Sequence, residues 1–137
     1  MKNKPIIIVA GEPKSIFFEI FLKALKKNNF KSPLILICCK NLLLQQIRKN
    51  QFKRKLKIIE INQLDNNIIL NNKTINLIDI KLQKSSNKKN QEKFSKKYLN
   101  ASFRTAFKLI KNGFTNKFIN GPINKKIFLE KKFLGVT

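Results

Sequence analysis

Two short loops hold the residue types that could do chemistry in this chain. The Gly11 loop (residues 11–13, Gly-Glu-Pro) and the Gly121 loop (residues 121–125, Gly-Pro-Ile-Asn-Lys) each follow an expected strand. Glycine lets a backbone approach a ligand closely, and the Lys125 ammonium could meet a phosphate or a carboxylate. Both loops stand where a strand is expected to end and a helix to begin. Ligands bind at that edge of open α/β sheets, and helix N-termini attract anions there.

The same loops also permit a simpler interpretation. Gly and Pro commonly mark strand-to-helix turns whatever the function, and Glu12 could be a solvated loop acid. The two loops therefore predict where a site would lie and leave its reaction open.

Composition excludes several catalytic arrangements. The chain has no His, so it has neither a Ser-His-Asp nor a Cys-His arrangement. Its four glycines do not form a G-x-G-x-x-G fingerprint or a Walker phosphate loop. None of its seven acids has a metal-ligand spacing, so no metal site can be built from this segment alone. Cys38 and Cys39 are adjacent in an expected buried strand and point to opposite faces, which predicts two core thiols in a reducing compartment.

The elements that would position the two loops alternate between strand and helix. Continuous apolar runs at residues 5–10 and 34–39 predict strands buried on both faces, and residues 56–61 are a third strand candidate. Amphipathic patterns predict helices from Ile16 to about Asn28 with Ser15 as the N-cap, at residues 41–49, and at residues 94–111 with Gly113 just beyond the end. A short strand at residues 117–120 leads into the Gly121 loop. This alternation predicts an α/β fold with a parallel, doubly wound sheet.

The middle of the chain departs from this alternation of strand and helix. Residues 68–70 and 74–80 predict two strands of a small antiparallel hairpin about the Asn-rich turn 71–73. Residues 83–92 are polar and predict a surface loop, because strong apolar patterning resumes directly afterwards.

The net charge of +23 is interpreted mostly as background. Of the 30 basic residues only Arg48, Arg54 and Arg104 are arginine, the preferred reader of base edges. Abundant Lys, Asn and Ile are what an AT-rich coding sequence produces, and the lysines are spread along the chain. We therefore expect no specific nucleic-acid partner. No apolar run reaches membrane-spanning length or resembles a secretory signal, so we expect a cytoplasmic protein with no membrane contact.

Two blocks of sequence resemble the 4-hydroxythreonine-4-phosphate dehydrogenase family. Residues 8–13, Ile-Val-Ala-Gly-Glu-Pro, followed by Glu19-Ile20 and Lys-Ala-Leu at 23–25, resemble the family's opening, which reads Gly-(Asp/Glu)-Pro-Ala-Gly-Ile-Gly-Pro-Glu before a helix. Residues 101–111, Gly113 and residues 118–125, Phe-Ile-Asn-Gly-Pro-Ile-Asn-Lys, resemble its stretch ending Val-Thr-(Ala/Gly)-Pro-Ile-Asn-Lys. The order and separation of the two blocks also fit.

The resemblance implies that residues 1–137 are the N-terminal portion of a larger α/β dehydrogenase. Its fold would be an incomplete isocitrate/isopropylmalate-dehydrogenase-like α/β/α sheet, which binds NAD without the glycine fingerprint. The implied activity is an NAD-dependent, metal-assisted oxidation of 4-phosphooxy-threonine by a homodimer, in pyridoxal phosphate biosynthesis, with decarboxylation of the 3-oxo product. The substrate and cofactor cleft would be lined by Gly11, Glu12, Pro13, Gly121, Pro122, Asn124 and Lys125.

The resemblance also locates what this segment lacks. The family's Gly-His-Thr-Glu signature and its three metal-binding histidines would follow residue 137, so the divalent metal's ligands are expected there. The segment alone is then expected to have no dehydrogenase activity.

One departure stands out. At residues 14–19 the chain has Lys-Ser-Ile-Phe-Phe-Glu, so Ser15 and Phe17 replace two family glycines that allow close backbone approach. A diverged member with another phosphorylated hydroxy-acid substrate remains an alternative. A second alternative, from a different class, is a stand-alone basic α/β domain that binds nucleic acid.

Overall fold

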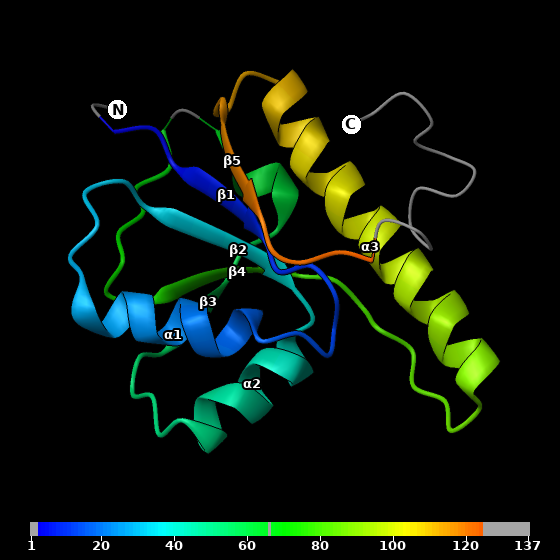
Figure 1. Ribbon diagram of the computed structural model, residues 1–137. Coiled ribbons are helices and arrows are strands. Elements are labelled where there is room, and N and C mark those ends of the chain that lie inside the picture. Colours follow the sequence, from blue (N-terminus) through cyan, green and yellow to red (C-terminus); the bar gives the residue numbers. More distant parts are fainter. Residues whose placement is uncertain (1–2, 66, 125–137) are drawn as a thin grey trace.

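Residues 3–65 and 67–124 are described by the computed structural model, and within them five parallel strands form one sheet in the order β3-β4-β2-β1-β5 (Figure 1). The strands are β1 (Ile6–Val9), β2 (Leu34–Cys38), β3 (Leu56–Ile58), β4 (Ile75–Asp79) and β5 (Lys117–Asn120). The strands predicted at residues 5–10, 34–39 and 117–120 are confirmed, and all five residues of β2 are buried.

Helices cover both faces of the sheet (Figure 1). Helix α1 (Phe17–Lys27) and helix α2 (Lys40–Lys49) lie on one face, and helix α3 (Lys88–Lys111) lies on the other. Alternate residues of each strand point to opposite faces, so Ile7 and Val9 join the core under α3 while Ile8 joins the core under α1. The molecule is thus the three-layer α/β fold with a parallel sheet that the sequence predicts.

Helix α3 begins earlier than its apolar pattern predicts. The Asn87 side chain accepts hydrogen bonds from the backbone N–H groups of Lys89 (2.9 Å) and Asn90 (3.3 Å), which caps the helix at its first turn. The predicted surface loop at residues 83–92 was therefore too long, since residues 88–92 are helical. The other end agrees with the prediction: Gly113 has φ +79° and follows the last helical turn.

The predicted antiparallel hairpin was wrong. Residues 68–70 form no strand, and β4 pairs in parallel with both β2 and β3. The Asn-rich segment is fixed by long-range bonds instead of a hairpin turn. The Asn72 side chain accepts from the Leu34 N–H (2.9 Å) and donates to the Ser32 carbonyl (2.9 Å), which ties the start of β4 to the start of β2.

Two boundaries differ by a few residues. The third strand ends at Ile58, because residues 61–63 form the 3₁₀ turn η1 (Ile61–Gln63), in which the Gln63 side chain accepts from the Glu60 N–H (2.8 Å). Helix α1 begins one residue later than the predicted cap implies. Ser15 still accepts the Phe17 N–H, at 3.3 Å.

Both cysteines are buried and free, as predicted for core thiols. In the part of the chain that the structure describes, no helix combines the length and apolar character that crossing a membrane requires.

Candidate functional site

The two predicted loops leave the sheet side by side. Strands β1 and β5 are parallel neighbours, with Val9 opposite Asn120, so residues 10–13 and 121–124 emerge at the same carboxyl edge. The connection after β1 runs through α1 on one face, whereas the connection into β5 runs through α3 on the other. This reversal between neighbouring strands is a topological switch point, where open α/β sheets bind their ligands.

The two glycines allow the loops to touch. Gly11 has φ +89°, and a Cβ placed on it would lie 2.8 Å from the carbonyl carbon of Gly121. A Cβ on Gly121 would in turn lie 2.9 Å from the carbonyl carbon of Ala10. Because these atoms are backbone, they cannot rotate away, and no larger residue fits either position without movement of a loop. The glycines at these positions are therefore required by backbone contact, which goes beyond ordinary turn formation.

Hydrogen bonds then lock the loops together. The Gly121 N–H donates to the Val9 carbonyl (2.7 Å), and the Glu12 N–H donates to the Pro122 carbonyl (2.7 Å). The Glu12 carboxylate accepts the Asn124 N–H at 2.9 Å. Glu12 is thus a positioning residue for the Gly121 loop rather than a free loop acid.

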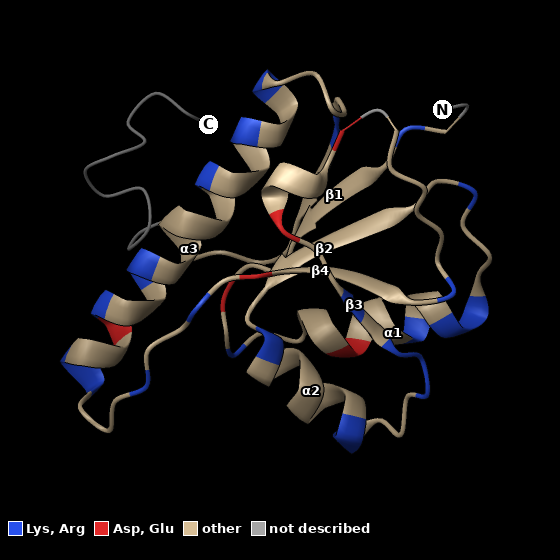
Figure 2. Ribbon diagram, turned by 180° about the vertical axis from the view of Figure 1, so that it is seen from behind, with Lys and Arg blue, Asp and Glu red and all other residues tan. Residues whose placement is uncertain are grey.

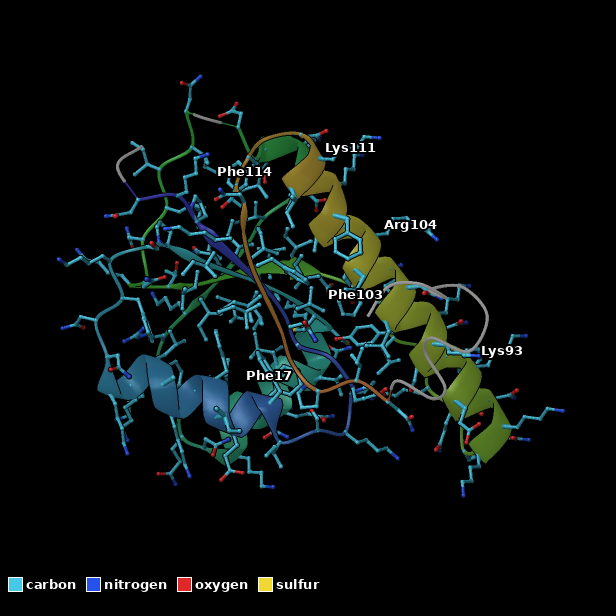
Figure 3. All side chains as sticks on the ribbon, turned by 45° about the horizontal axis from the view of Figure 1, so that its top comes forward. Phe17, Lys93, Phe103, Arg104, Lys111 and Phe114 are labelled. Atoms are coloured by element: carbon cyan, nitrogen blue, oxygen red, sulfur yellow. The ribbon has the colours of Figure 1, made fainter. Side chains whose placement is uncertain are left out.

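Phe17, one of the two departures from the family pattern, packs at this junction. The Phe17 ring lies close to Gly121: a Cβ placed on Gly121 would be 2.8 Å from the Cδ1 atom of Phe17. The Phe17 ring also stacks on the Phe21 ring, with centroids 5.6 Å apart. Figure 3 shows Phe17 at the start of α1, below the crossing of the two loops. The larger side chain therefore closes the α1 side of the junction.

A cavity of about 760 Å³ opens beside the joined loops. It lies within the size range of small-molecule sites, about 300–1,000 Å³. Its walls come from both loops, from α2, from the segment before α3 and from the first half of α3. The charged residues of these walls are Glu12, Lys14, Lys84, Lys88, Glu92 and Lys96.

The cavity favours anions. Lysines at its wall outnumber glutamates, four to two, and a cleft lined by an excess of one charge raises the local concentration of oppositely charged ligands. Lys125, predicted to add a further cation, lies outside the described residues. The other predicted cleft residues, Gly11, Glu12, Pro13, Gly121, Pro122 and Asn124, lie together in the two loops.

Sequence reasoning missed the α3 side of the cavity. Lys84 stands in the predicted surface loop, and Lys88, Gln91 and Glu92 stand at the start of α3. Ser85-Ser86-Asn87 could have indicated these residues, because a run of residues that favour the N-cap predicts a helix start even before an apolar stripe begins.

A second cluster beneath the carboxyl edge is structural. The Tyr98 hydroxyl accepts the buried Cys39 N–H at 2.9 Å, and Asp79 accepts the Lys40 N–H at 2.8 Å. Burial raises the pKa of the Cys38 thiol, and neighbouring Cys39 and Asp79 raise it further. Burial likewise raises the pKa of the Tyr98 hydroxyl. Both groups stay protonated at neutral pH and supply no nucleophile. The bonds to Tyr98 and Asp79 hold the start of α2 against the sheet.

A divalent metal does not fit the described residues. They hold no group of three His, Cys, Asp or Glu side chains that could bind one ion.

Comparison with known proteins gives a fold and no family match. No family model matches the chain, and no curated protein sequence matches it. Among solved structures, it resembles a 4-hydroxythreonine-4-phosphate dehydrogenase from Klebsiella pneumoniae with a TM-score of 0.72 at 22% identity, over 93% of this chain and 40% of that one. The corresponding enzyme from Burkholderia phymatum gives 0.71 at 15% identity, over 93% and 38%.

A putative 4-hydroxythreonine-4-phosphate dehydrogenase from Salmonella typhimurium gives a TM-score of 0.75 at 22% identity, over 96% of this chain and 42% of that one. The three likenesses show that the predicted dehydrogenase-like α/β fold is present. The chain spans about two fifths of the length of these structures.

Proposed function

We propose that this chain forms the first part of the α/β core of a 4-hydroxythreonine-4-phosphate dehydrogenase. The observation that carries the proposal is the junction of the Gly11 and Gly121 loops at the switch point of the sheet. Both loops have the residues of the family resemblance, and the surrounding fold is the one seen in the three solved dehydrogenases. The full-length protein of this proposal is a cytoplasmic homodimer in pyridoxal phosphate biosynthesis.

In the proposal, the described residues bind and orient a phosphorylated hydroxy amino acid. The cations at the cavity wall, among them Lys84 and Lys88, attract the phosphate and carboxylate of the substrate. The bond from the Asn124 N–H to the Glu12 carboxylate keeps the Gly121 loop in place beside the substrate. The rigid backbone junction holds one wall of the cleft fixed, which favours a defined substrate orientation.

NAD is the proposed cofactor, and when bound it would accept the hydride released as the substrate hydroxyl is oxidised. The carboxyl edge of an open α/β sheet at its switch point is a general place for nucleotide binding, which supports NAD at this edge. No step of the proposal passes through a metal held by the described residues; by resemblance, the metal ligands are expected beyond residue 137.

Calorimetric titration of the purified chain with 4-phosphooxy-threonine tests the binding part of the proposal. The double variant Lys84→Gln/Lys88→Gln should bind the ligand roughly 2- to 30-fold more weakly, since each exposed cation contributes about 0.2–1 kcal/mol. The matched control Lys53→Gln/Lys57→Gln loses the same charge from exposed positions outside the cavity wall and should bind like the unaltered chain. Equal weakening in both variants, or no binding to the unaltered chain, would contradict the proposal.

Two further measurements test the location of the missing catalytic ligands and the identity of the substrate. With NAD and a divalent metal added, the 137-residue chain should produce no NADH from the substrate, and measurable NADH would contradict the expected location of the missing ligands. Titration with O-phosphoserine and with O-phosphothreonine distinguishes the named substrate from another phosphorylated hydroxy acid. Binding of either compound more tightly than 4-phosphooxy-threonine would favour the diverged alternative.

A further inference from the structure

Six cations form a continuous stripe on the outer side of α3. Lys and Arg recur at spacings of three, four and seven residues, and together they define the α3 ridge: Lys89, Lys93, Lys97, Arg104, Lys108 and Lys111. At 3.6 residues per turn these positions fall within an arc of about 100°, and they extend over roughly 33 Å of the helix. Figure 2 shows the basic residues along successive turns of α3.

The ridge lies opposite the buried side of α3. Tyr98, Leu99, Ser102 and Ala106 face the sheet, whereas every residue of the ridge is exposed. In Figure 3, Lys93, Arg104 and Lys111 point away from the sheet.

No acid interrupts this stripe. Glu92, the one acid in the α3 sequence, lies at the cavity wall and borders the ridge only at its first turn, beside Lys89. The exposed face of α1 differs, since there Lys23 is paired with Glu19 at 3.3 Å. The helical period of α3 therefore places five of the chain's lysines and Arg104 on one face, while the other lysines stay distributed over the chain.

We propose that the α3 ridge binds the phosphate backbone of duplex nucleic acid without reading its sequence. A row of exposed cations on one helix face complements the dense negative charge of a phosphate backbone. Five of the six cations are lysine, which acts as a point charge and reads bases poorly, so the contact is independent of sequence. This site is separate from the cavity of the proposed function and does not depend on it.

The orientation of α3 favours nucleic acid over a membrane. A helix that lies on a lipid surface must insert its apolar face, but the apolar face of α3 is buried against the sheet. An acidic protein would need a matching set of acids on its surface, whereas a nucleic-acid duplex presents closely spaced phosphates in every sequence.

Fluorescence anisotropy with labelled 20-base-pair DNA and RNA duplexes tests the ridge. For the unaltered chain, log K should fall with log salt at a slope of about −5, as expected when six phosphates are neutralised. The variant Lys93→Gln/Lys97→Gln/Arg104→Gln/Lys108→Gln should reduce the slope to about −2 and weaken binding roughly 1,000-fold near 0.1 M salt. The control Lys26→Gln/Lys27→Gln/Lys53→Gln/Lys57→Gln removes the same four charges elsewhere and should weaken binding less than about threefold.

Three outcomes would overturn the proposal. Equal losses in the two variants would show that general charge attraction, not the ridge, holds the duplex. Ridge-dependent binding to poly-glutamate, or to vesicles containing phosphatidylserine, as tight as binding to duplex would assign the ridge to another partner. Lysine acetylation of the unaltered chain, mapped by mass spectrometry, keeps the test independent of variant folding: duplex should protect the ridge lysines and leave Lys26 and Lys27 reactive, and the reverse would overturn the proposal.

Discussion

Gly11 and Gly113 both have a left-handed backbone, with φ of +89° and +79°, but their surroundings differ. A Cβ on Gly11 would lie 2.8 Å from the Gly121 carbonyl carbon, whereas a Cβ on Gly113 would have no heavy atom within 4 Å. The pair therefore separates two costs of replacing glycine. Gly113→Ala carries the conformational cost alone, and Gly11→Ala adds the collision between the two loops.

The expected magnitudes follow from these two costs. A non-glycine residue in the left-handed region costs about 1–2 kcal/mol, so Gly113→Ala should lower the free energy of unfolding by about that amount. Forcing an extra methyl group into a packed site costs a further 1–3 kcal/mol or so. Gly11→Ala should therefore cost about 2–5 kcal/mol in total.

Urea unfolding followed by circular dichroism measures both variants under the same conditions. The free energy of unfolding should fall by about 1–3 kcal/mol more for Gly11→Ala than for Gly113→Ala, with similar m-values. Equal losses would show that the Gly121 loop can move aside at no cost. That result would refute the argument that backbone contact between the loops requires glycine.

Three further predictions concern the scaffold under the cleft. Tyr98→Phe removes the acceptor of the buried Cys39 N–H and should lower the free energy of unfolding by about 1–3 kcal/mol, and an unchanged urea midpoint would show that another group accepts this N–H. Asn72→Ala should cost a similar amount, about 1–3 kcal/mol, because the Leu34 N–H loses its side-chain partner, and a Lys73→Ala control should cost little. The pKa of the Cys38 thiol is raised in the folded state, so as pH rises above about 8.5 the thiol ionises first in the unfolded chain and the free energy of unfolding should fall. In Cys38→Ala this fall should be smaller. An identical pH profile in the variant would contradict a raised pKa of the Cys38 thiol.

The strands β1 and β2, which support the cleft, could be predicted because their local composition indicates burial. β1 and β2 are runs of apolar, mostly β-branched or Leu residues, and such runs are typical of strands covered on both faces. The Gly11 loop could be placed for the same reason, since it directly follows β1, whereas the Gly121 loop follows the mostly exposed strand β5 and was placed by its own Gly-Pro pair. Their mutual contact could not be predicted, because it depends on β5 pairing with β1 after more than a hundred intervening residues.

The errors have a common physical cause, which is that long-range bonds outweigh local patterns. The Asn-rich segment before β4 has the composition of a hairpin turn, but the Asn72 side chain bonds to a segment about 40 residues earlier in the chain. Helix α3 was placed too short because its first turns extend past the sheet and line the cavity. Those turns need no apolar stripe, so the sequence there does not show the 3.6-residue apolar period that predicts a helix.

Nuclear magnetic resonance of the ¹⁵N-labelled chain tests most directly whether the joined loops form a binding cleft. Titration with 4-phosphooxy-threonine should shift the amide signals of Glu12, Lys14, Gln91 and Asn124, which surround the cavity, while the signals of β3 and of the far end of α3 (residues 104–111) stay unchanged. Threonine without the phosphate should produce much smaller shifts. Unchanged signals at the two loops, or equal shifts with threonine, would contradict a cleft for a phosphorylated substrate at this edge of the sheet.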